Sequence, residues 1–119
     1  MDKTIRIADK DVTVRKTFGT ELRYKRQFGR EFQMDLRRIL AMRSELTPDL
    51  EKSKKAQIVM GIETEWMYDI LFIMAQQADP TITDELEWLD RFDSFNIWLV
   101  FDQIVPLLVA ESKAAPKND

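Results

Sequence analysis

The chain has 119 residues, with 18 Lys+Arg against 21 Asp+Glu, and 45% of its residues are hydrophobic. This length and apolar fraction suffice for one hydrophobic core and one domain. Because the sequence contains neither Cys nor His, disulfide scaffolds, thiolate or imidazole metal sites and Cys- or His-dependent catalysis are excluded.

Two short segments near the N-terminus alternate apolar and polar residues. Thr4–Ile7 and Val12–Arg15 have the period-two pattern of a half-buried strand. The polar segment Ala8–Asp11 between them is prone to turn, so we predict a β-hairpin over residues 3–16. A two-stranded hairpin is marginally stable alone, and its apolar face should therefore pack on helices.

A long amphipathic helix is predicted after the turn-prone segment Thr17–Thr20. Thr20 is a suitable N-cap, and apolar residues follow at helical spacing as far as about Arg43. Gly29 falls inside this segment and costs about 1 kcal/mol relative to Ala in a helix interior. The apolar positions of this predicted helix are Tyr24, Phe28, Phe32, Leu36, Ile39 and Leu40.

A second helix is expected to start at Thr47–Pro48, with the threonine as its N-cap and the proline in its first turn. Its apolar residues recur at helical spacing from Ile58 to Met74. Asp79–Pro80 should end it, because proline cannot continue a helix.

A short acidic helix is expected next, with Thr81 or Thr83 as its N-cap. Its carboxylates are Asp84, Glu85, Glu87, Asp90 and Asp93. A catalytic or metal site needs carboxylates that converge in a pocket, whereas acidic residues after an N-cap stabilise the helix dipole without any ligand. The segment also lacks the mid-loop glycine of an EF-hand. We therefore interpret this cluster as a solvated helix start and expect no enzymatic activity.

The last predicted helix runs from Phe95 to about Ala110, opens at Ser94 and should be kinked or split by Pro106. It is apolar on nearly all sides. Such a helix is buried on most of its surface, so we expect it to be central or to form a homo-oligomer interface.

Charge is divided along the chain. Residues 15–43 contain nine Lys/Arg and three Asp/Glu, a net of +6, whereas residues 63–102 contain ten Asp/Glu and one Arg, a net of −9. Four arginines are expected on the helix face opposite the aromatic residues, as a basic stripe: Arg23, Arg26, Arg30 and Arg37. The stripe is either a solvated face or a binding surface. If it binds, the overall charge of −3 favours an acidic protein surface, including the acidic half of a second copy, over nucleic acid as its partner.

Five of the twelve aromatic residues lie between positions 86 and 101: Trp88, Phe92, Phe95, Trp98 and Phe101. Aromatic residues at helical spacing are mostly core. Trp88 and Leu89 are neighbours on a short helix, however, so both cannot point fully inward, and one of them is a candidate exposed anchor. We treat Trp88, Trp98 and Phe101 as candidate partner contacts.

Two sequence strings resemble a known family. The run Leu22–Arg30 (LRYKRQFGR) follows a Thr- and Gly-containing turn, and Glu87–Phe92 (EWLDRF) precedes the last helix. In order and spacing the chain resembles, over about residues 3 to 110, the tail assembly chaperones of long-tailed phages that infect Gram-positive bacteria. The family-motif positions are Arg23, Tyr24, Phe28, Gly29 and Arg30, and later Trp88, Leu89 and Phe92.

The resemblance implies a non-catalytic role without a cofactor, metal ion or small-molecule substrate. Chaperones of this family coat the tape-measure protein and recruit tail-tube protein, and they are absent from the finished virion. Many are also made in a longer form through a −1 ribosomal frameshift. Pro116–Asn118 can be encoded by CCA-AAA-AAC, a sequence that permits such slippage.

The expected location is the cytoplasm of the bacterial host. The N-terminus lacks the apolar core of a signal peptide, and no segment has the roughly 20 apolar residues that cross a bilayer. We therefore expect a soluble protein that does not bind a membrane.

These patterns together predict a mainly α (α+β) fold, with a short N-terminal β-hairpin followed by four or five helices. One domain should span residues 1–110, with helices from residue 20, and a flexible polar tail should follow at 111–119. Two alternatives to the chaperone remain open: a small helical adaptor or regulator that binds one host protein, and a nucleic-acid-binding module that uses the basic helix 20–43.

Overall fold

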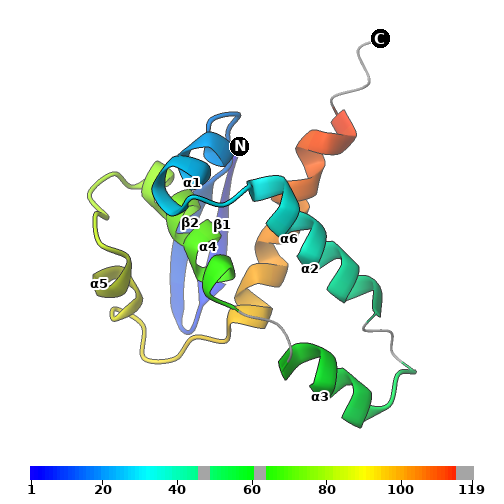
Figure 1. Ribbon diagram of the computed structural model, residues 1–119. Helices are drawn as coiled ribbons and strands as arrows, with labels where there is room; N and C mark the ends of the chain where they lie inside the picture. The colour runs from blue at the N-terminus through cyan, green and yellow to red at the C-terminus, as the bar shows by residue number, and fades with distance from the viewer. Residues whose placement is uncertain (46–48, 61–63, 115–119) are drawn as a thin grey trace.

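The structure is a computed structural model that describes residues 1–45, 49–60 and 64–114. A two-stranded antiparallel sheet opens the chain, and six helices follow in the described residues (Figure 1). A mainly α fold with an N-terminal hairpin is thus confirmed, with one or two more helices than predicted. The elements are β1 (Asp2–Ile7), β2 (Lys10–Arg15), α1 (Thr20–Phe28), α2 (Phe32–Glu45), α3 (Lys52–Met60), α4 (Glu65–Ala78), α5 (Glu85–Leu89) and α6 (Ile97–Ala114).

The hairpin pairs in the register expected from its alternation. Ile7 lies opposite Lys10 and Asp2 opposite Arg15, which leaves a two-residue turn at Ala8 and Asp9. Ala8 has a positive φ of 57°, the conformation that tight hairpin turns require. The apolar residues of one face are buried or half-buried: Ile5, Ile7, Val12 and Val14.

The core forms where α4 and α6 pack on the hairpin. α4 contacts β2, α1 and α6, and it is buried at Trp66, Met67 and every residue from 69 to 75. α6 contacts β1 and buries seven apolar residues: Ile97, Val100, Phe101, Ile104, Val105, Leu107 and Leu108. The apolar surface of the last helix is therefore used mainly within the chain, and α4 is the central helix.

The side chain of Gln103 on α6 ties this helix to the edge of β1. Its Oε1 accepts a hydrogen bond from the backbone N–H of Arg6 at 2.9 Å, and its Nε2 donates to the Arg6 carbonyl at 2.8 Å. Lys3 Nζ donates to the Gln103 carbonyl at 2.7 Å. One amide side chain thus satisfies both backbone groups of a strand residue.

The long helix predicted over residues 20–43 is two helices, and Gly29 separates them. Gly29 has φ +73° in the left-handed region, and its N–H donates to the Lys25 carbonyl at 2.8 Å. This is the glycine C-cap that ends many helices. The apolar spacing continues across the break because the turn brings Phe32 back onto Tyr24, with ring centroids 5.7 Å apart.

The predicted N-caps of three helices, α1, α5 and α6, were wrong. Thr20 is the first residue of α1 and its hydroxyl accepts from the Thr17 N–H instead. Asp84, and neither Thr81 nor Thr83, caps α5 by accepting from the Glu87 N–H at 2.8 Å.

At the start of α6, Asn96 has the role predicted for Ser94. Its Oδ1 accepts from the N–H groups of Trp98 and Leu99 at 3.1 and 3.2 Å. Pro106 lies inside α6, which continues past it to Ala114, so the proline does not split the helix.

The second predicted helix also divides in two. α3 ends at Met60 and α4 begins at Glu65. The expected start at Thr47–Pro48 lies outside the described residues, and so does the end of the tail at 115–119. The end of α4 at Ala78, before Asp79–Pro80, is confirmed.

Candidate functional site

Two family-motif residues of the first string, Tyr24 and Arg30, meet in a polar cluster between α1, α2 and α4. Tyr24 Oη donates to Asp35 Oδ2 at 2.7 Å, and Arg30 Nε donates to Tyr24 Oη at 3.1 Å. Arg30 Nη2 forms an ion pair with Asp69 of α4. Tyr24, Asp35 and Asp69 are buried, so this cluster joins three helices from inside the fold.

The turn at Gly29 explains the position of Arg30. Because α1 ends there, Arg30 leaves the helix phase and folds back, with its guanidinium carbon 5.5 Å from the Tyr24 ring centre and 5.7 Å from the Phe28 ring centre. The expectation that Arg30 lies on the face away from the aromatic residues is therefore wrong. Tyr24 is buried and Phe28 half-buried, and both contribute to the fold.

The electrostatics of this cluster fix its charges at neutral pH. Burial and the hydrogen bond with Asp35 raise the pKa of Tyr24 above its ordinary value. Burial lowers the pKa of Arg30, but its hydrogen bonds to Tyr24 and Asp69 outweigh burial and raise that pKa overall. Tyr24 thus stays neutral and Arg30 stays charged, which suits an internal support and not proton transfer.

Glu85 of the acidic helix joins the same cluster. Burial, a hydrogen bond with Asp69 and the charges of Asp69 and Glu65 raise the pKa of Glu85 to about 8, although Arg30 opposes the shift. The interpretation of the whole acidic segment as solvated is wrong at this residue. The other four carboxylates are exposed: Asp84, Glu87, Asp90 and Asp93.

The outward face of α1 carries the residues of the motif string that do not build the cluster. Leu22 is 50% exposed, and Arg26 lies one turn beyond it on the same face of α1. Phe18, in the turn before α1, is 91% exposed. We name these three residues the α1 ridge. Arg23 and Lys25 flank it and are exposed. Phe18 and Leu22 were not predicted as exposed residues, although the spacing of four from Leu22 to Arg26, on the face of α1 opposite Tyr24, is a usable signal for Leu22.

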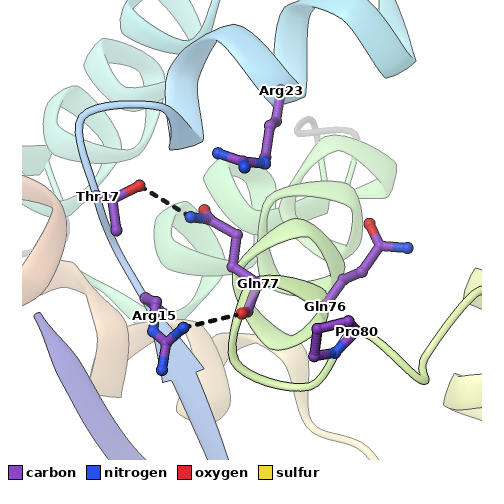
Figure 2. Close-up of a pocket in the computed structure, with 6 residues that line it drawn as sticks. All are labelled: Arg15, Thr17, Arg23, Gln76, Gln77 and Pro80. Atoms are coloured by element: carbon purple, nitrogen blue, oxygen red, sulfur yellow. Dashed lines mark hydrogen bonds between the residues drawn. The ribbon is translucent and has the colours of Figure 1, made fainter.

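Arg23 also points toward an open pocket of about 480 Å³ between the end of β2 and the end of α4 (Figure 2). Three of its polar lining residues, Arg15, Thr17 and Gln77, bind one another. Gln77 Nε2 donates to Thr17 Oγ1 at 2.9 Å, and Arg15 Nη1 donates to the Gln77 carbonyl at 3.3 Å.

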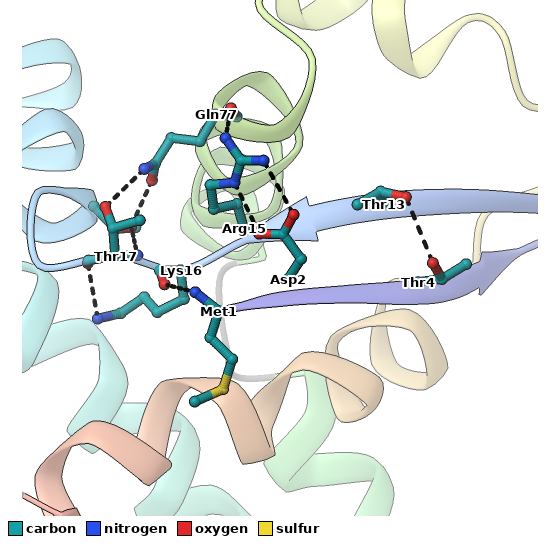
Figure 3. Close-up of polar contacts among 9 residues, drawn as sticks. Met1, Asp2, Thr4, Thr13, Arg15, Lys16, Thr17 and Gln77 are labelled. Carbon is teal, nitrogen blue, oxygen red and sulfur yellow. Dashed lines mark hydrogen bonds and ion pairs between the residues drawn. The ribbon is translucent and has the colours of Figure 1, made fainter.

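Arg15 is also held by a residue of the neighbouring strand β1. Arg15 forms two hydrogen bonds with the carboxylate of Asp2, at 2.8 and 3.0 Å (Figure 3). On the same outer face of the hairpin, the hydroxyls of Thr4 and Thr13 lie 3.5 Å apart. The bonds of Arg15, Thr17 and Gln77 make the pocket a junction between the hairpin and α4.

Two of the three aromatic contact candidates lie in the core. Trp88 is 2% exposed and packs among Phe72, Phe92 and Phe95, and Phe101 is 1% exposed with its ring 6.0 Å from that of Trp66. Neither is accessible to a partner in this structure, which corrects both assignments. The motif residues Leu89 and Phe92 are half-buried against the same core.

The exposed apolar residue of α5 is therefore neither Trp88 nor Leu89. It is Leu86, which is 71% exposed. Trp88 is buried and Leu89 is half-buried, so both of these neighbouring side chains face the core, whereas Leu86 faces solvent.

Trp98 remains at the surface, in a groove between α2 and α6. It is half-buried, its neighbour Leu99 is exposed, and both line a cavity of about 190 Å³ with Ile39 and Met42 of α2. Arg37 is exposed on α2. Among the described residues, large apolar side chains are thus exposed at the α1 ridge, at Leu86 and in this groove, and also at Met1, Met34 and Leu40.

Comparisons with models of protein families, with curated proteins and with solved structures found no match. Among the described residues, no cluster of three or more acidic side chains is arranged to hold a metal ion. Within the same part of the chain, no helix is both long enough and apolar enough to cross a bilayer.

Proposed function

We propose that this protein is a non-catalytic binding protein that acts as a phage tail assembly chaperone. In this role it coats the tape-measure protein, keeps it soluble and recruits tail-tube protein in the cytoplasm of the bacterial host. The observation that carries the proposal is the division of the motif string Leu22–Arg30 into two sets. Tyr24, Phe28 and Arg30 hold helices together, whereas Leu22 and Arg26 face solvent beside Phe18.

The distribution of exposed apolar side chains supports this role. A partner with long amphipathic helices offers many similar apolar sites, and a chaperone for it needs several weak contacts and no deep pocket. Here Phe18 and Leu22, Leu86 and Leu99 are exposed on different elements. Separate small surfaces of this kind allow neighbouring copies to bind successive turns of an extended partner.

Coexpression with the long, helix-rich protein expected to be encoded directly downstream tests the proposal. The measurement is copurification followed by size-exclusion chromatography with light scattering. We expect a soluble complex that holds many copies of this chain per partner. A complex of fixed low stoichiometry would instead identify an adaptor, and an insoluble partner with this chain eluting alone would contradict the chaperone.

Salt dependence separates the nucleic-acid alternative. A protein that neutralises phosphates loses affinity with a slope of about −0.9 in log K against log [salt] for each phosphate contacted. We expect no binding to duplex DNA with such a slope. Binding that depends steeply on salt and is lost in Arg26→Ser and Arg37→Ser would favour the nucleic-acid-binding module.

The frameshifted longer form belongs to the same proposal and is read from the gene. Slippage requires that the codons of Pro116–Asn118 form an uninterrupted adenine run. A Lys117 codon that ends in G, or a −1 frame closed by a stop codon, would rule it out.

A further inference from the structure

The exposed face of α5 carries one apolar side chain among carboxylates. Leu86 is 71% exposed, and Asp90 lies one turn later on the same side, with its N–H bonded to the Leu86 carbonyl at 2.9 Å. Asp93 follows and is exposed. We name Leu86, Asp90 and Asp93 the α5 patch. In the described residues, neither carboxylate of the patch forms an ion pair with the same chain.

The α1 ridge is basic whereas the α5 patch is acidic, and it likewise combines exposed apolar side chains with a charged one. Phe18 and Leu22 supply its apolar part, and Arg26 its charge, with Arg23 beside it. Within the part of the chain that the structure describes, Arg26 has no carboxylate partner. The ridge and the patch are both exposed, so they do not cover each other in one copy. The ridge lies on α1 and the turn before it, and the patch lies on α5 and the residues that follow it, and these two helices are separate in the fold (Figure 1).

We propose that the α1 ridge of one copy docks on the α5 patch of a second copy. Association would bury Phe18 and Leu22 against Leu86, and it would place Arg26 beside Asp90. Like charges directly opposed in an interface are strongly unfavourable, so ridge on ridge and patch on patch are disfavoured. The charge pattern therefore selects one pairing of the two surfaces.

This contact joins two different surfaces, and that has a consequence for assembly. A copy that uses its ridge still presents its patch, so the contact can extend to further copies unless rotation closes a ring. The contact needs no tape-measure protein. It can therefore fail while the proposed function stands, and the reverse also holds.

A charge-exchange series tests the pairing with three variants: Arg26→Glu, Asp90→Lys and the two changes combined in one chain. The measurement is the dissociation constant of self-association from sedimentation equilibrium, with circular dichroism to check the fold. Each single variant should weaken self-association by about tenfold or more, because it opposes like charges. The combined variant should recover most of the loss, because each contact again joins opposite charges.

Lys54→Glu is the control, since Lys54 is an exposed basic residue of α3 outside both the ridge and the basic stripe. It should leave the dissociation constant unchanged.

A second pair of variants needs no charge reversal: Leu22→Ser and Leu86→Ser should each associate weakly alone. Mixed together, they should form a dimer, since one supplies an intact patch and the other an intact ridge.

Three results would overturn the inference. The first is a wild-type chain that stays monomeric up to about 1 mM, the weak end of specific association. The second is a combined variant that associates no better than Arg26→Glu alone. The third is a loss in Lys54→Glu equal to that in Arg26→Glu, which would reduce the effect to net charge.

Discussion

At the scale of single residues, the two arginines Arg26 and Arg30 lie four positions apart and have different roles. A continuous helix would place both on one face, and the sequence analysis made that assumption. Gly29 ends α1 between them, so Arg26 stays on the exposed face while Arg30 turns inward to Asp69. The motif can be recognised in the sequence, but which of its residues are exposed and which are internal depends on the left-handed conformation of Gly29.

Substitution of Arg30 should expose this difference. Arg30→Met leaves the buried carboxylate of Asp69 without its cation, and we expect the free energy of unfolding to fall by about 2 kcal/mol. This is less than the loss for a fully buried pair because part of the Arg30 side chain is solvent-exposed. Urea denaturation measures the change. Arg26→Met is the control and should stay within about 0.5 kcal/mol of wild type; equal effects would contradict the assigned roles.

At the scale of elements, alternation and helical spacing predicted the hairpin, the end of α4 and most core positions. The caps could not be predicted, because several residues able to cap lie close together before each helix. Ser94 and Asn96 both precede α6, and Thr83 and Asp84 both precede α5. Which oxygen reaches the free N–H groups depends on where the chain enters the helix, and tertiary packing determines that point.

The start of α6 offers a direct comparison of the two candidates. Asn96→Ala removes the acceptor for two backbone N–H groups, and we expect it to lower the free energy of unfolding by about 1 kcal/mol. Thermal or urea unfolding measures the loss. Ser94→Ala should have no comparable effect, and a larger loss for Ser94→Ala would restore the cap predicted from the sequence.

At the scale of the whole molecule, the two oppositely charged halves of the sequence meet inside the fold. Arg30 comes from the basic half and Asp69 and Glu85 from the acidic half. Part of the opposite charge of the two halves is therefore paired within the chain, although the sequence led us to expect all of it at the surface, solvated or bound to partners. Net charge per segment does not distinguish these internal pairs from the surface charges at Arg26 and Asp90, because burial is a property of the packed chain.

The stability of the molecule should depend on pH through Glu85. Its pKa is raised from 4.5 to about 8 in the fold, so the folded state keeps a proton that the unfolded state releases. The free energy of unfolding should therefore fall as the pH rises from 4.5 through about 8. Asp69, Glu65 and Arg30 are the charged groups around this carboxyl.

Glu85→Gln keeps a hydrogen-bond donor toward Asp69 and removes the titration. We expect its melting temperature to exceed that of wild type above pH 8 and to lose this part of the pH dependence. Thermal unfolding at pH 5.5 and at about pH 9 measures both. Glu87→Gln, at an exposed position of the same helix, should follow wild type. A wild-type melting temperature that rises across this range would contradict the burial of Glu85.

The bonds between Gln103 and Arg6 bear on how the chain acquires its structure. Arg6 lies on β1, the first strand of the chain, and its backbone bonds to the side chain of Gln103 on α6, 97 positions later. A slide of α6 by one residue would rotate the amide by about 100° away from the strand, so these two bonds also fix the helix in one register. A hairpin is marginally stable by itself, and contacts so distant in sequence slow folding. β1 is synthesised first, but it gains these two hydrogen bonds to α6 only after residue 103 has been synthesised.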